Sequence, residues 1–285
     1  MTNIDYKIVV PSYGRASTIG NYTMKYLRES DVDLSRVHIF AANSEEAEKY
    51  QSSCPDVNVV VGVKGLVQQR KFISEYFDRG TRLWSFDDDV SAIETIELLK
   101  KLDSNQKPLD HPCRLTPVNS LDGFIQRGWR LAETYEVGLW GCYAVRNKGF
   151  LHPKINVGLK FVMGHGFGFY AGDPAFDEIE EYPMKDDFYL SLWHTENRNG
   201  TLVFNDHCIK SKAHSGVGGT NEDMAAKLAK NNETVEKIVA RFPELASVKM
   251  RRTKDEWLSK YMELRLKLVT TDSISTLNLL NASFA

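Results

Sequence analysis

Three adjacent aspartates, Asp87, Asp88 and Asp89, are the residues of this sequence with the clearest capacity for chemistry. Neighbouring carboxylates repel one another, so they are stable on a solvated loop or beside a cation that neutralises them. Mg²⁺ and Mn²⁺ prefer carboxylate oxygens and share their coordination shell with substrate phosphates. The large apolar residues at 83–86 are typical of a buried strand, in which Asp87 and Asp89 would point the same way. The pattern predicts a metal site at the end of a core strand; the structural alternative is an acidic turn.

A second pair of carboxylates, Asp186 and Asp187, stands at the beginning of a predicted amphipathic helix in "YPMKDDFYLSLW". Acidic residues at a helix start are favoured by the helix dipole, which is sufficient reason for their presence. The functional alternative is a general base beside an acceptor hydroxyl.

Two segments combine glycine with arginine at the start of a predicted helix. In "VVPSYGRASTI", Arg15 and the backbone donors of the turn could meet a nucleotide. The segment is neither GxGxxG nor GxxxxGK[ST], which disfavours a nicotinamide site and a P-loop. In "VKGLVQQRKFI", Gly65 permits a tight turn into the helix, and Gln69 and Arg70 follow one turn later. Arg70 could reach a diphosphate; a solvated helix face is the alternative.

The later part of the chain adds a histidine and a basic segment. His214 lies in "KSKAHSGVGG", where the glycines would allow a mobile loop to close over a diphosphate–metal unit, although an isolated loop histidine is often incidental. Residues 249–267 hold seven basic and three acidic side chains, a local charge of 7 − 3 = +4 in a chain of net charge −2. This segment is interpreted as a helix that packs on the rest of the chain or binds the phosphates of DNA.

The elements that must position these residues alternate between strand and helix over the first ninety residues. Such alternation predicts βαβ units and a mainly parallel sheet, in which ligands bind at the carboxyl ends of the strands. The predicted strands cover residues 6–10, 36–43, 57–62 and the apolar run before the aspartates.

After the aspartates the pattern changes. Residues 103–120 contain three prolines and are predicted to form a long loop. The stretch 156–172, rich in glycine and aromatics, is predicted to be strand, loop and strand with its backbone near a ligand. Helices are predicted at 121–136 and 184–200, and most of the chain after 221 is predicted helical. We therefore expect a catalytic domain over 1–219 and a helical C-terminal extension over 220–285.

Composition limits the class of protein. Of 285 residues, 42% are hydrophobic and 26% charged, as in ordinary globular proteins, and the net charge of −2 gives no global attraction to nucleic acid or lipid. The four cysteines form no CxxC pair, so neither a zinc site nor a disulfide framework is predicted. No signal sequence or apolar run of membrane-spanning length is apparent. These features favour a cytoplasmic protein with no membrane association.

The order of the motifs resembles the GT-A glycosyltransferases. "IVVPSYGR" is similar to their first strand and nucleotide-binding turn, "FDDDV" to their DxD motif, and "KDDFYLSLW" to the late "ED" motif of inverting family-2-like members. "GLVQQRKFI" followed by "SFDDDV" also resembles the TET-associated glycosyltransferase group, which is linked to viral and phage sugar addition on hydroxymethylated DNA pyrimidines. The resemblance spans residues 7–219. It implies an α/β fold with a Rossmann-like, mixed and mainly parallel sheet flanked by helices.

The resemblance also implies a role for individual residues. Those that would border the nucleotide are Pro11, Ser12, Arg15, Asn43, Gly65, Gln69 and Arg70. Asp87 and Asp88 would lie near the ribose and sugar, and Asp89, with Asp87 and His214, would hold Mn²⁺ or Mg²⁺. Asp187 would be the base of an inverting reaction, with Asp186 as the next candidate. The donor would be a nucleoside-diphosphate sugar such as a UDP-sugar, and the acceptor a hydroxymethylated pyrimidine in DNA or a sugar already on it.

Two other functions fit parts of the sequence. A sugar nucleotidyltransferase also uses carboxylate-bound Mg²⁺ on a Rossmann-like sheet, but its glycine-rich opening signature is absent here. A nucleic-acid-binding module would use the basic C-terminal helices. Metal-dependent release of a nucleoside diphosphate, rather than pyrophosphate, separates the glycosyltransferase from both.

Overall fold

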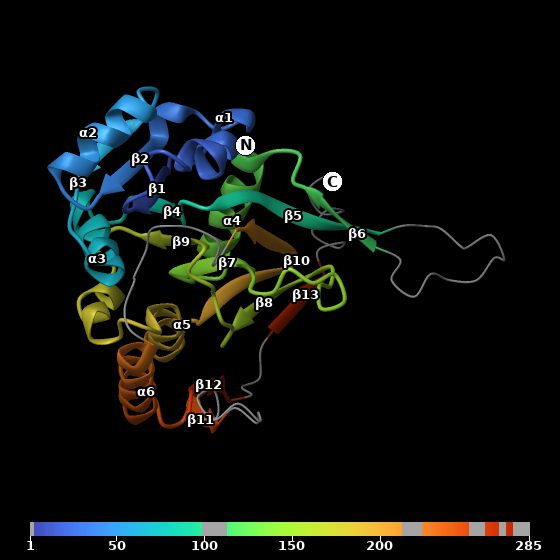
Figure 1. Cartoon of the computed structure of the whole chain (residues 1–285). Coiled ribbons are helices and arrows are strands. Elements are labelled where there is room, and N and C mark those ends of the chain that lie inside the picture. The colour runs from blue at the N-terminus through green and yellow to red at the C-terminus, as the bar shows by residue number, and fades with distance from the viewer. Residues whose placement is uncertain (1–2, 99–112, 213–223, 251–259, 268–271, 276–285) are drawn as a thin grey trace.

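The computed structural model describes residues 3–98, 113–212, 224–250, 260–267 and 272–275. Four parallel strands form one half of an eleven-stranded mixed sheet, in the order β4 (Arg82–Phe86), β1 (Lys7–Ser12), β2 (Val37–Ala41) and β3 (Asn58–Val61) (Figure 1). Each was predicted from a short apolar run such as "IVV", which suits a strand covered on both faces.

Antiparallel pairings dominate the other half of the sheet. From β4 the order continues through β9 (Gly166–Tyr170), β7 (Leu139–Tyr143), β10 (Thr201–Ser211), β8 (Lys154–Gly158) and β13 (Asp272–Ser275). Within it, β10 runs parallel to β7 and antiparallel to β8. A long strand, β5 (Val90–Leu98), pairs with β10 and with β6 (Cys113–Pro117).

Helices cover both faces of the sheet, and the alternation along β1 shows how. Ile8 belongs to an apolar cluster with α1 (Thr23–Glu29), α2 (Ser44–Ser53) and α4 (Leu121–Thr134). Val9 belongs to a second cluster with α3 (Leu66–Tyr76), α5 (Asp186–Asn197) and α6 (Met224–Arg241). Short 3-10 helices lie at Ile19–Asn21, Leu34–Arg36, Pro174–Phe176 and Ile179–Glu181. The expected α/β architecture is therefore confirmed.

Two local predictions were wrong. The proline-rich loop expected at 103–120 includes the strand β6, because β5 is long enough to leave a free edge with which Cys113–Pro117 pairs. The C-terminal segment was expected to be helical, and α6 is, but β11 (Ala246–Met250) and β12 (Met262–Leu266) form an antiparallel hairpin. In "MELRL" apolar and charged residues alternate with period two, which suits a strand.

The register brings the ends of several strands to one edge. Because β1 and β4 are parallel, with Val9 opposite Ser85, Ser12 and the residues after Phe86 meet at the same edge. The antiparallel β9 begins there, since Gly166 lies opposite Phe86. This edge carries the aspartates and their neighbours.

Candidate active site

The three aspartates occupy a tight turn between β4 and β5 that is fixed by its backbone. The amide of Asp87 donates to the carbonyl of His165 at 3.0 Å, and the hydroxyl of Thr23 donates to the carbonyl of Asp87 at 2.7 Å. The carbonyl of Asp89 accepts from the amide of Lys212 at 3.1 Å. Residues that precede β9, begin α1 and follow β10 thus hold the acidic turn in place.

The extended strand conformation predicted for Asp87 and Asp89 was wrong, because the chain turns at Asp88 and Asp89. An Nη atom of Arg70 lies 3.6 Å from Asp87 Oδ1. On the other side, Arg15 Nη1 lies 2.6 Å from Asp88 Oδ1 and 3.6 Å from Asp89 Oδ2. Two arginines from different helix-start segments therefore share the charge of the three carboxylates.

Arg70 joins the acidic turn to the second carboxylate pair. It is only 4% exposed, and its Nη1 donates to Asp186 Oδ2 at the start of α5 while its Nη2 donates to the carbonyl of Gly164 at 2.8 Å. The guanidinium lies over the ring of Phe167, with its central carbon 5.3 Å from the centroid. The structure thus brings Asp87 and Asp186, about 100 positions apart, to one buried cation.

Asp187 follows at the first turn of α5. Its Oδ1 accepts from the amide of Phe188 at 2.9 Å, and the residue is partly exposed. Burial, followed by repulsion from Asp186, raises the pKa of Asp187 to about 6, with Arg70 acting in the opposite direction. A carboxylate with a raised pKa at a site edge has the properties of a general base.

The first turn of the chain presents Ser12 and Arg15 to the aspartates. The Ser12 hydroxyl donates to Asp88 Oδ2 at 2.6 Å and lies 2.6 Å from the Tyr50 hydroxyl, which also accepts from the Arg15 amide at 3.1 Å. Burial raises the pKa of Asp88 above its usual value, against the opposing effects of Ser12 and Arg15. Both carboxylate oxygens of Asp88 are therefore occupied by contacts with Ser12 and Arg15.

Four other residues expected near the nucleotide have structural contacts. Asn43 caps α2 by accepting from the Glu46 amide at 2.9 Å, and the buried Gln69 donates to the Phe40 carbonyl at 2.8 Å and accepts from the Val63 amide at 2.7 Å. Gly65 precedes α3 with φ +104°, a conformation that favours glycine. Pro11 is a buried residue of β1. His214 lies outside the described residues.

The carboxylates fit a divalent cation at one oxygen in particular. Asp89 Oδ1 is buried and has no hydrogen-bond partner among the described residues. Among all the described residues, no group of three or more His, Cys, Asp or Glu side chains is arranged to hold a metal. A cation at Asp89 would therefore need further ligands from elsewhere, such as a diphosphate.

Residues that the sequence analysis did not select also belong to this edge. His165 supplies the carbonyl for Asp87, and its Nδ1 lies 3.0 Å from the Ser211 hydroxyl. Tyr50 orients Ser12, and Thr23 fixes the turn. No local sequence signal identifies His165 or Tyr50, because their partners are distant in the chain.

The glycines of "GHGFGFY" make room for side chains of the protein. A Cβ at Gly168 would lie 2.1 Å from Trp140 Nε1, and one at Gly166 would lie 2.5 Å from the Ile209 Cδ1. A Cβ at Gly164 would meet the guanidinium of Arg70 at 2.7 Å. This strand is close-packed against the core and Arg70.

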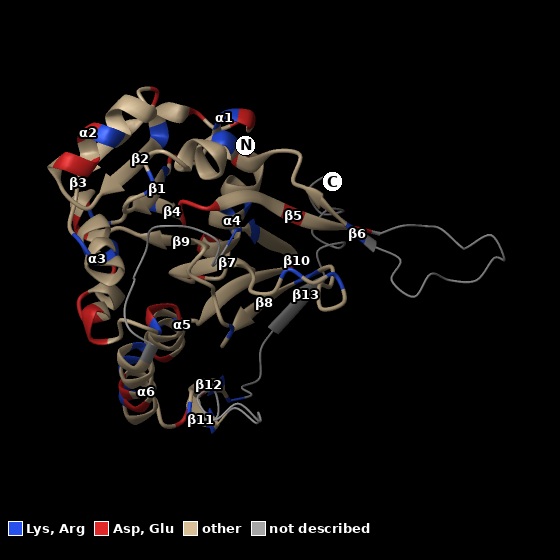
Figure 2. Ribbon diagram, in the orientation of Figure 1, with Lys and Arg blue, Asp and Glu red and all other residues tan. Residues whose placement is uncertain are grey.

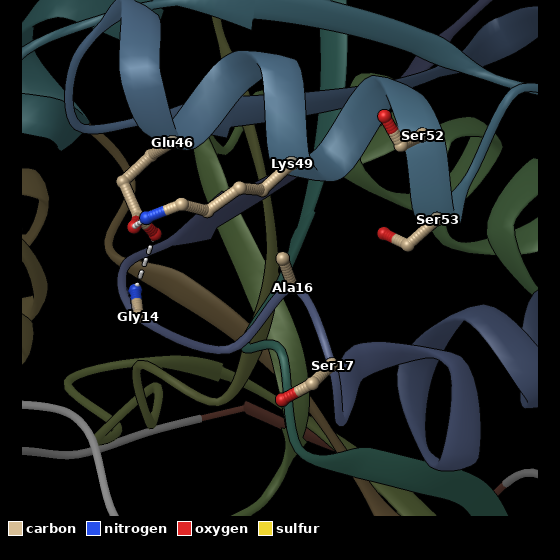
Figure 3. A pocket seen from close by; sticks show the side chains of 7 residues that line it. All are labelled: Gly14, Ala16, Ser17, Glu46, Lys49, Ser52 and Ser53. Atoms are coloured by element: carbon tan, nitrogen blue, oxygen red, sulfur yellow. Dashed lines mark hydrogen bonds and ion pairs between the residues drawn. The ribbon is translucent and has the colours of Figure 1, made fainter.

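Two cavities lie near the site, and the larger one is not lined by the carboxylates described above. The first, of ≈ 570 Å³, lies between the Gly14–Ser17 loop and α2, where Lys49 and the Gly14 amide flank Glu46 (Figure 3). None of the three aspartates lines it. The second, of ≈ 180 Å³, is lined in part by His165 and Ser211 and so borders the acidic turn. Geometry favours the smaller cavity as part of the reaction site.

Solved structures of similar fold share little sequence with this chain. S. aureus TarS 1–349 in complex with UDP-GlcNAc is 12% identical over 84% of this chain and 72% of its own, with a TM-score of 0.47. The mannosyltransferase PcManGT from Pyrobaculum calidifontis in complex with GDP-Man and Mn²⁺ is 12% identical over 83% and 63%, with a TM-score of 0.44. Glucosyl-3-phosphoglycerate synthase from Mycobacterium tuberculosis, with Mn²⁺, UDP and glucosyl-3-phosphoglycerate, is 9% identical over 96% and 91%, with a TM-score of 0.42.

The chain spans less than two thirds of some of these proteins, 59% in another TarS 1–349 crystal. No curated protein matches the sequence. Among the described residues, no helix combines the length and apolar character needed to cross a bilayer.

Residues 6–121 of the chain match the family described as TET-Associated Glycosyltransferase. That segment carries β1, Arg15, Arg70 and the three aspartates, so the resemblance drawn from these motifs is confirmed over the part of the chain that contains them.

Proposed function

We propose that the protein transfers a sugar from a nucleoside-diphosphate sugar to an acceptor hydroxyl, with Asp89 holding a divalent cation and Asp187 acting as the base. The observation that carries this proposal is the connection of the two carboxylate groups through Arg70, which contacts Asp87 and Asp186. This connection brings a metal-type carboxylate turn and a base-type carboxylate to one site, as transfer to a hydroxyl requires.

The cation would be Mn²⁺ or Mg²⁺ held by Asp89 and Asp87, and when bound it would neutralise charge on the departing diphosphate. Asp89 Oδ1 is a buried oxygen that lacks a hydrogen-bond partner among the described residues. His214, which the resemblance places beside the diphosphate, stays a prediction. Arg15 contacts Asp88 and Asp89. When the donor binds, its guanidinium would contact a donor phosphate in place of one of these carboxylates.

The transfer step follows from the position of Asp187. The acceptor oxygen forms a bond to the anomeric carbon as the bond from that carbon to the diphosphate oxygen breaks. The electron pair of the broken bond leaves with the nucleoside diphosphate, and the acceptor proton goes to a carboxylate oxygen of Asp187. Attack from the side opposite the leaving group inverts the anomeric configuration.

We further propose that the acceptor is a hydroxymethylated pyrimidine in DNA or a sugar attached to it, and that the donor is a UDP-sugar. The description of the matched family as TET-associated supports this acceptor. A base inside a duplex would have to be flipped out to reach Asp187. The basic segment 249–267 is a candidate contact for DNA phosphates, although two of its described parts are strands.

The experiment is to incubate the protein with Mn²⁺, a panel of nucleotide sugars, and hydroxymethylated DNA, unmodified DNA or free sugars, and to measure the mass of each acceptor. We expect a sugar added only to hydroxymethylated DNA, with lower yield at high salt because phosphate contacts release counterions. Efficient, salt-independent transfer to a free sugar would remove the DNA acceptor and leave the transferase. No transfer with any donor would contradict both.

A further inference from the structure

The cavity of ≈ 180 Å³ beside the acidic turn is built by the ends of three strands of the sheet. Its walls include Ala144 after β7, Met163 and His165 before β9, and Ile209 and Ser211 of β10. Arg146 also lines it. The cavity thus combines apolar walls with a few polar groups, as small-molecule sites do.

One wall of this cavity is next to residues that contact the acidic turn and Arg70, the partner of Asp186. Its wall residue His165 accepts the Asp87 amide through its carbonyl at 3.0 Å. Gly164, between the wall residues Met163 and His165, accepts from Arg70 at 2.8 Å, and Arg70 contacts Asp186. The short segment that forms one wall therefore reaches the acidic turn on one side and the start of α5 on the other.

Arg146 is held at the cavity by a buried partner. Its Nε and Nη2 donate to the two carboxylate oxygens of Glu94 at 2.5 and 3.0 Å. The Glu94 side chain is 6% exposed, whereas that of Arg146 is 45% exposed. A bidentate pair with one buried member fixes the plane of the guanidinium and leaves much of it accessible to a ligand.

His165 is fixed in a similar way, because its Nδ1 lies 3.0 Å from the hydroxyl of Ser211 on the neighbouring strand. Two polar groups of the cavity are therefore positioned by protein partners, Glu94 for Arg146 and Ser211 for His165. Such pre-positioning is expected of a binding site and not of incidental surface residues.

Size decides what the cavity can take. Pockets for drug-sized ligands measure about 300–1,000 Å³, so ≈ 180 Å³ suits one ring and excludes a whole nucleotide sugar. The loop that contains Arg146 exposes apolar and basic side chains together, with Val145 at 47% and Phe150 at 55% exposure. Figure 2 shows Lys and Arg on this loop between β7 and β8.

We propose that this cavity is the acceptor subsite and takes a single hydroxyl-bearing six-membered ring, which contacts Arg146 and His165. The proposal rests on the proposed function, because it needs an acceptor hydroxyl that reaches Asp187. A hydroxymethylated pyrimidine and a hexose share this chemistry, so the experiment must distinguish them.

The test uses the full chain with Mn²⁺ and a nucleotide sugar, and measures transfer to an acceptor relative to hydrolysis of the donor by water. Ala144→Phe fills the cavity, and Arg146→Ala removes one ring contact. Arg114→Ala is the matched control, because Arg114 of β6 pairs with Glu97 of β5, the strand that also holds Glu94, at 2.7 Å from Nε to Oε2, and does not line the cavity. Thermal melting verifies the fold; if Arg146→Ala fails to fold, Ala144→Phe alone decides.

We expect the ratio of transfer to hydrolysis to fall at least ~10-fold in Ala144→Phe and Arg146→Ala and to stay unchanged in Arg114→Ala. An unchanged ratio in a folded Ala144→Phe protein would overturn the acceptor subsite. Comparing an oligonucleotide that carries one 5-hydroxymethylcytosine with a free hexose identifies the source of the ring.

Failure of the proposed function has a different signature, since the wild-type chain would then release no nucleoside diphosphate from any donor. Equilibrium binding of the fluorescein-labelled oligonucleotide and of the free hexose to wild type and Ala144→Phe tests the cavity even then. Weaker binding of either one by the variant supports the subsite, and equal binding of both contradicts it.

Discussion

Asp89 is the residue at which a cation would be held, because its Oδ1 is buried without a partner among the described residues. Replacing Asp89 with Ala should reduce metal-dependent turnover more than ~100-fold, equivalent to about 3 kcal/mol of transition-state stabilisation. The fold should persist, since the remaining contact of Asp89 Oδ2 with Arg15 is 3.6 Å long. The measurement is release of nucleoside diphosphate as a function of Mn²⁺ concentration.

The control for that substitution is Asp5→Asn, which alters an exposed carboxylate of the N-terminal segment and should leave turnover unchanged. Near-normal turnover of a folded Asp89→Ala protein would show that the cation is held elsewhere.

Replacement of Asp187 is expected to affect the rate of transfer, and replacement of Asp186 the stability of the fold. Asp187→Asn should keep donor binding and lose transfer by ~100-fold or more, because the base is removed. Asp186→Asn should instead lower the free energy of unfolding by about 3 kcal/mol or more, because it leaves the buried Arg70 without its nearest partner. Donor affinity by calorimetry, transfer rate and urea unfolding measure the three effects. If donor affinity collapses in Asp187→Asn, that residue belongs to the donor site.

The pH dependence of the rate should report the pKa of Asp187, which burial and the neighbouring Asp186 raise to about 6. A base must be deprotonated to accept a proton, so kcat/KM should be level above this pH and fall tenfold per unit below it. The measurement is kcat/KM across pH ~5 to 8 at saturating Mn²⁺. A profile that stays level to pH ~4, the ordinary value of an aspartate, would contradict the role of Asp187.

At the scale of elements, Arg70 of α3 contacts both the acidic turn after β4 and the start of α5. Arg70→Gln should lower the free energy of unfolding by about 3–5 kcal/mol, because it leaves buried carboxylates uncompensated. Arg28→Gln breaks a surface pair with Asp56 whose side chains are 33% and 35% exposed, and should cost at most about 1 kcal/mol. Urea unfolding of both variants gives the comparison. Equal losses would show that Arg70 does not join these elements.

Local sequence patterns predicted β1, β2 and β4 because each is a short apolar run that is buried in the sheet. The edge strand β3 was predicted from its run of valines, although it is only partly buried. The capping role of Asn43 also had a local signal, since Glu46 stands three residues later in "NSEE". The partners of Arg70 had none, because Asp186 and Gly164 are brought to it only by the order of strands in the sheet.

The acidic turn shows the limit of strand periodicity. Alternation predicted that Asp87 and Asp89 share a face, but the chain turns at Asp88 to begin β5. The residue types at this turn can be read from the sequence, whereas their contacts depend on tertiary structure.

At the scale of the whole molecule, α6 is part of the core and not a separate appendage. Phe242 is 1% exposed and its ring centroid lies 6.1 Å from that of Tyr189 in α5. Phe242→Ala should lower the free energy of unfolding by about 3–5 kcal/mol. Val248→Ala, at a side chain 40% exposed, should change it by at most about 0.5 kcal/mol.

Chemical denaturation of both variants, followed by tryptophan fluorescence, provides the test. An equally small change in Phe242→Ala would mean that the segment after residue 219 folds independently of the sheet. That outcome would also revive the nucleic-acid-binding module as a separate function of the C-terminal residues.

The measurement that tests the central claim most directly is release of nucleoside diphosphate from a nucleotide sugar by the wild-type protein, with Mn²⁺, after EDTA, and after Mn²⁺ is restored. We predict release with Mn²⁺, its loss on chelation and its recovery on addition of the metal, because the acidic turn is proposed to hold the cation beside the diphosphate. Release of pyrophosphate instead, or a rate unaffected by EDTA, would contradict metal-dependent sugar transfer at this site.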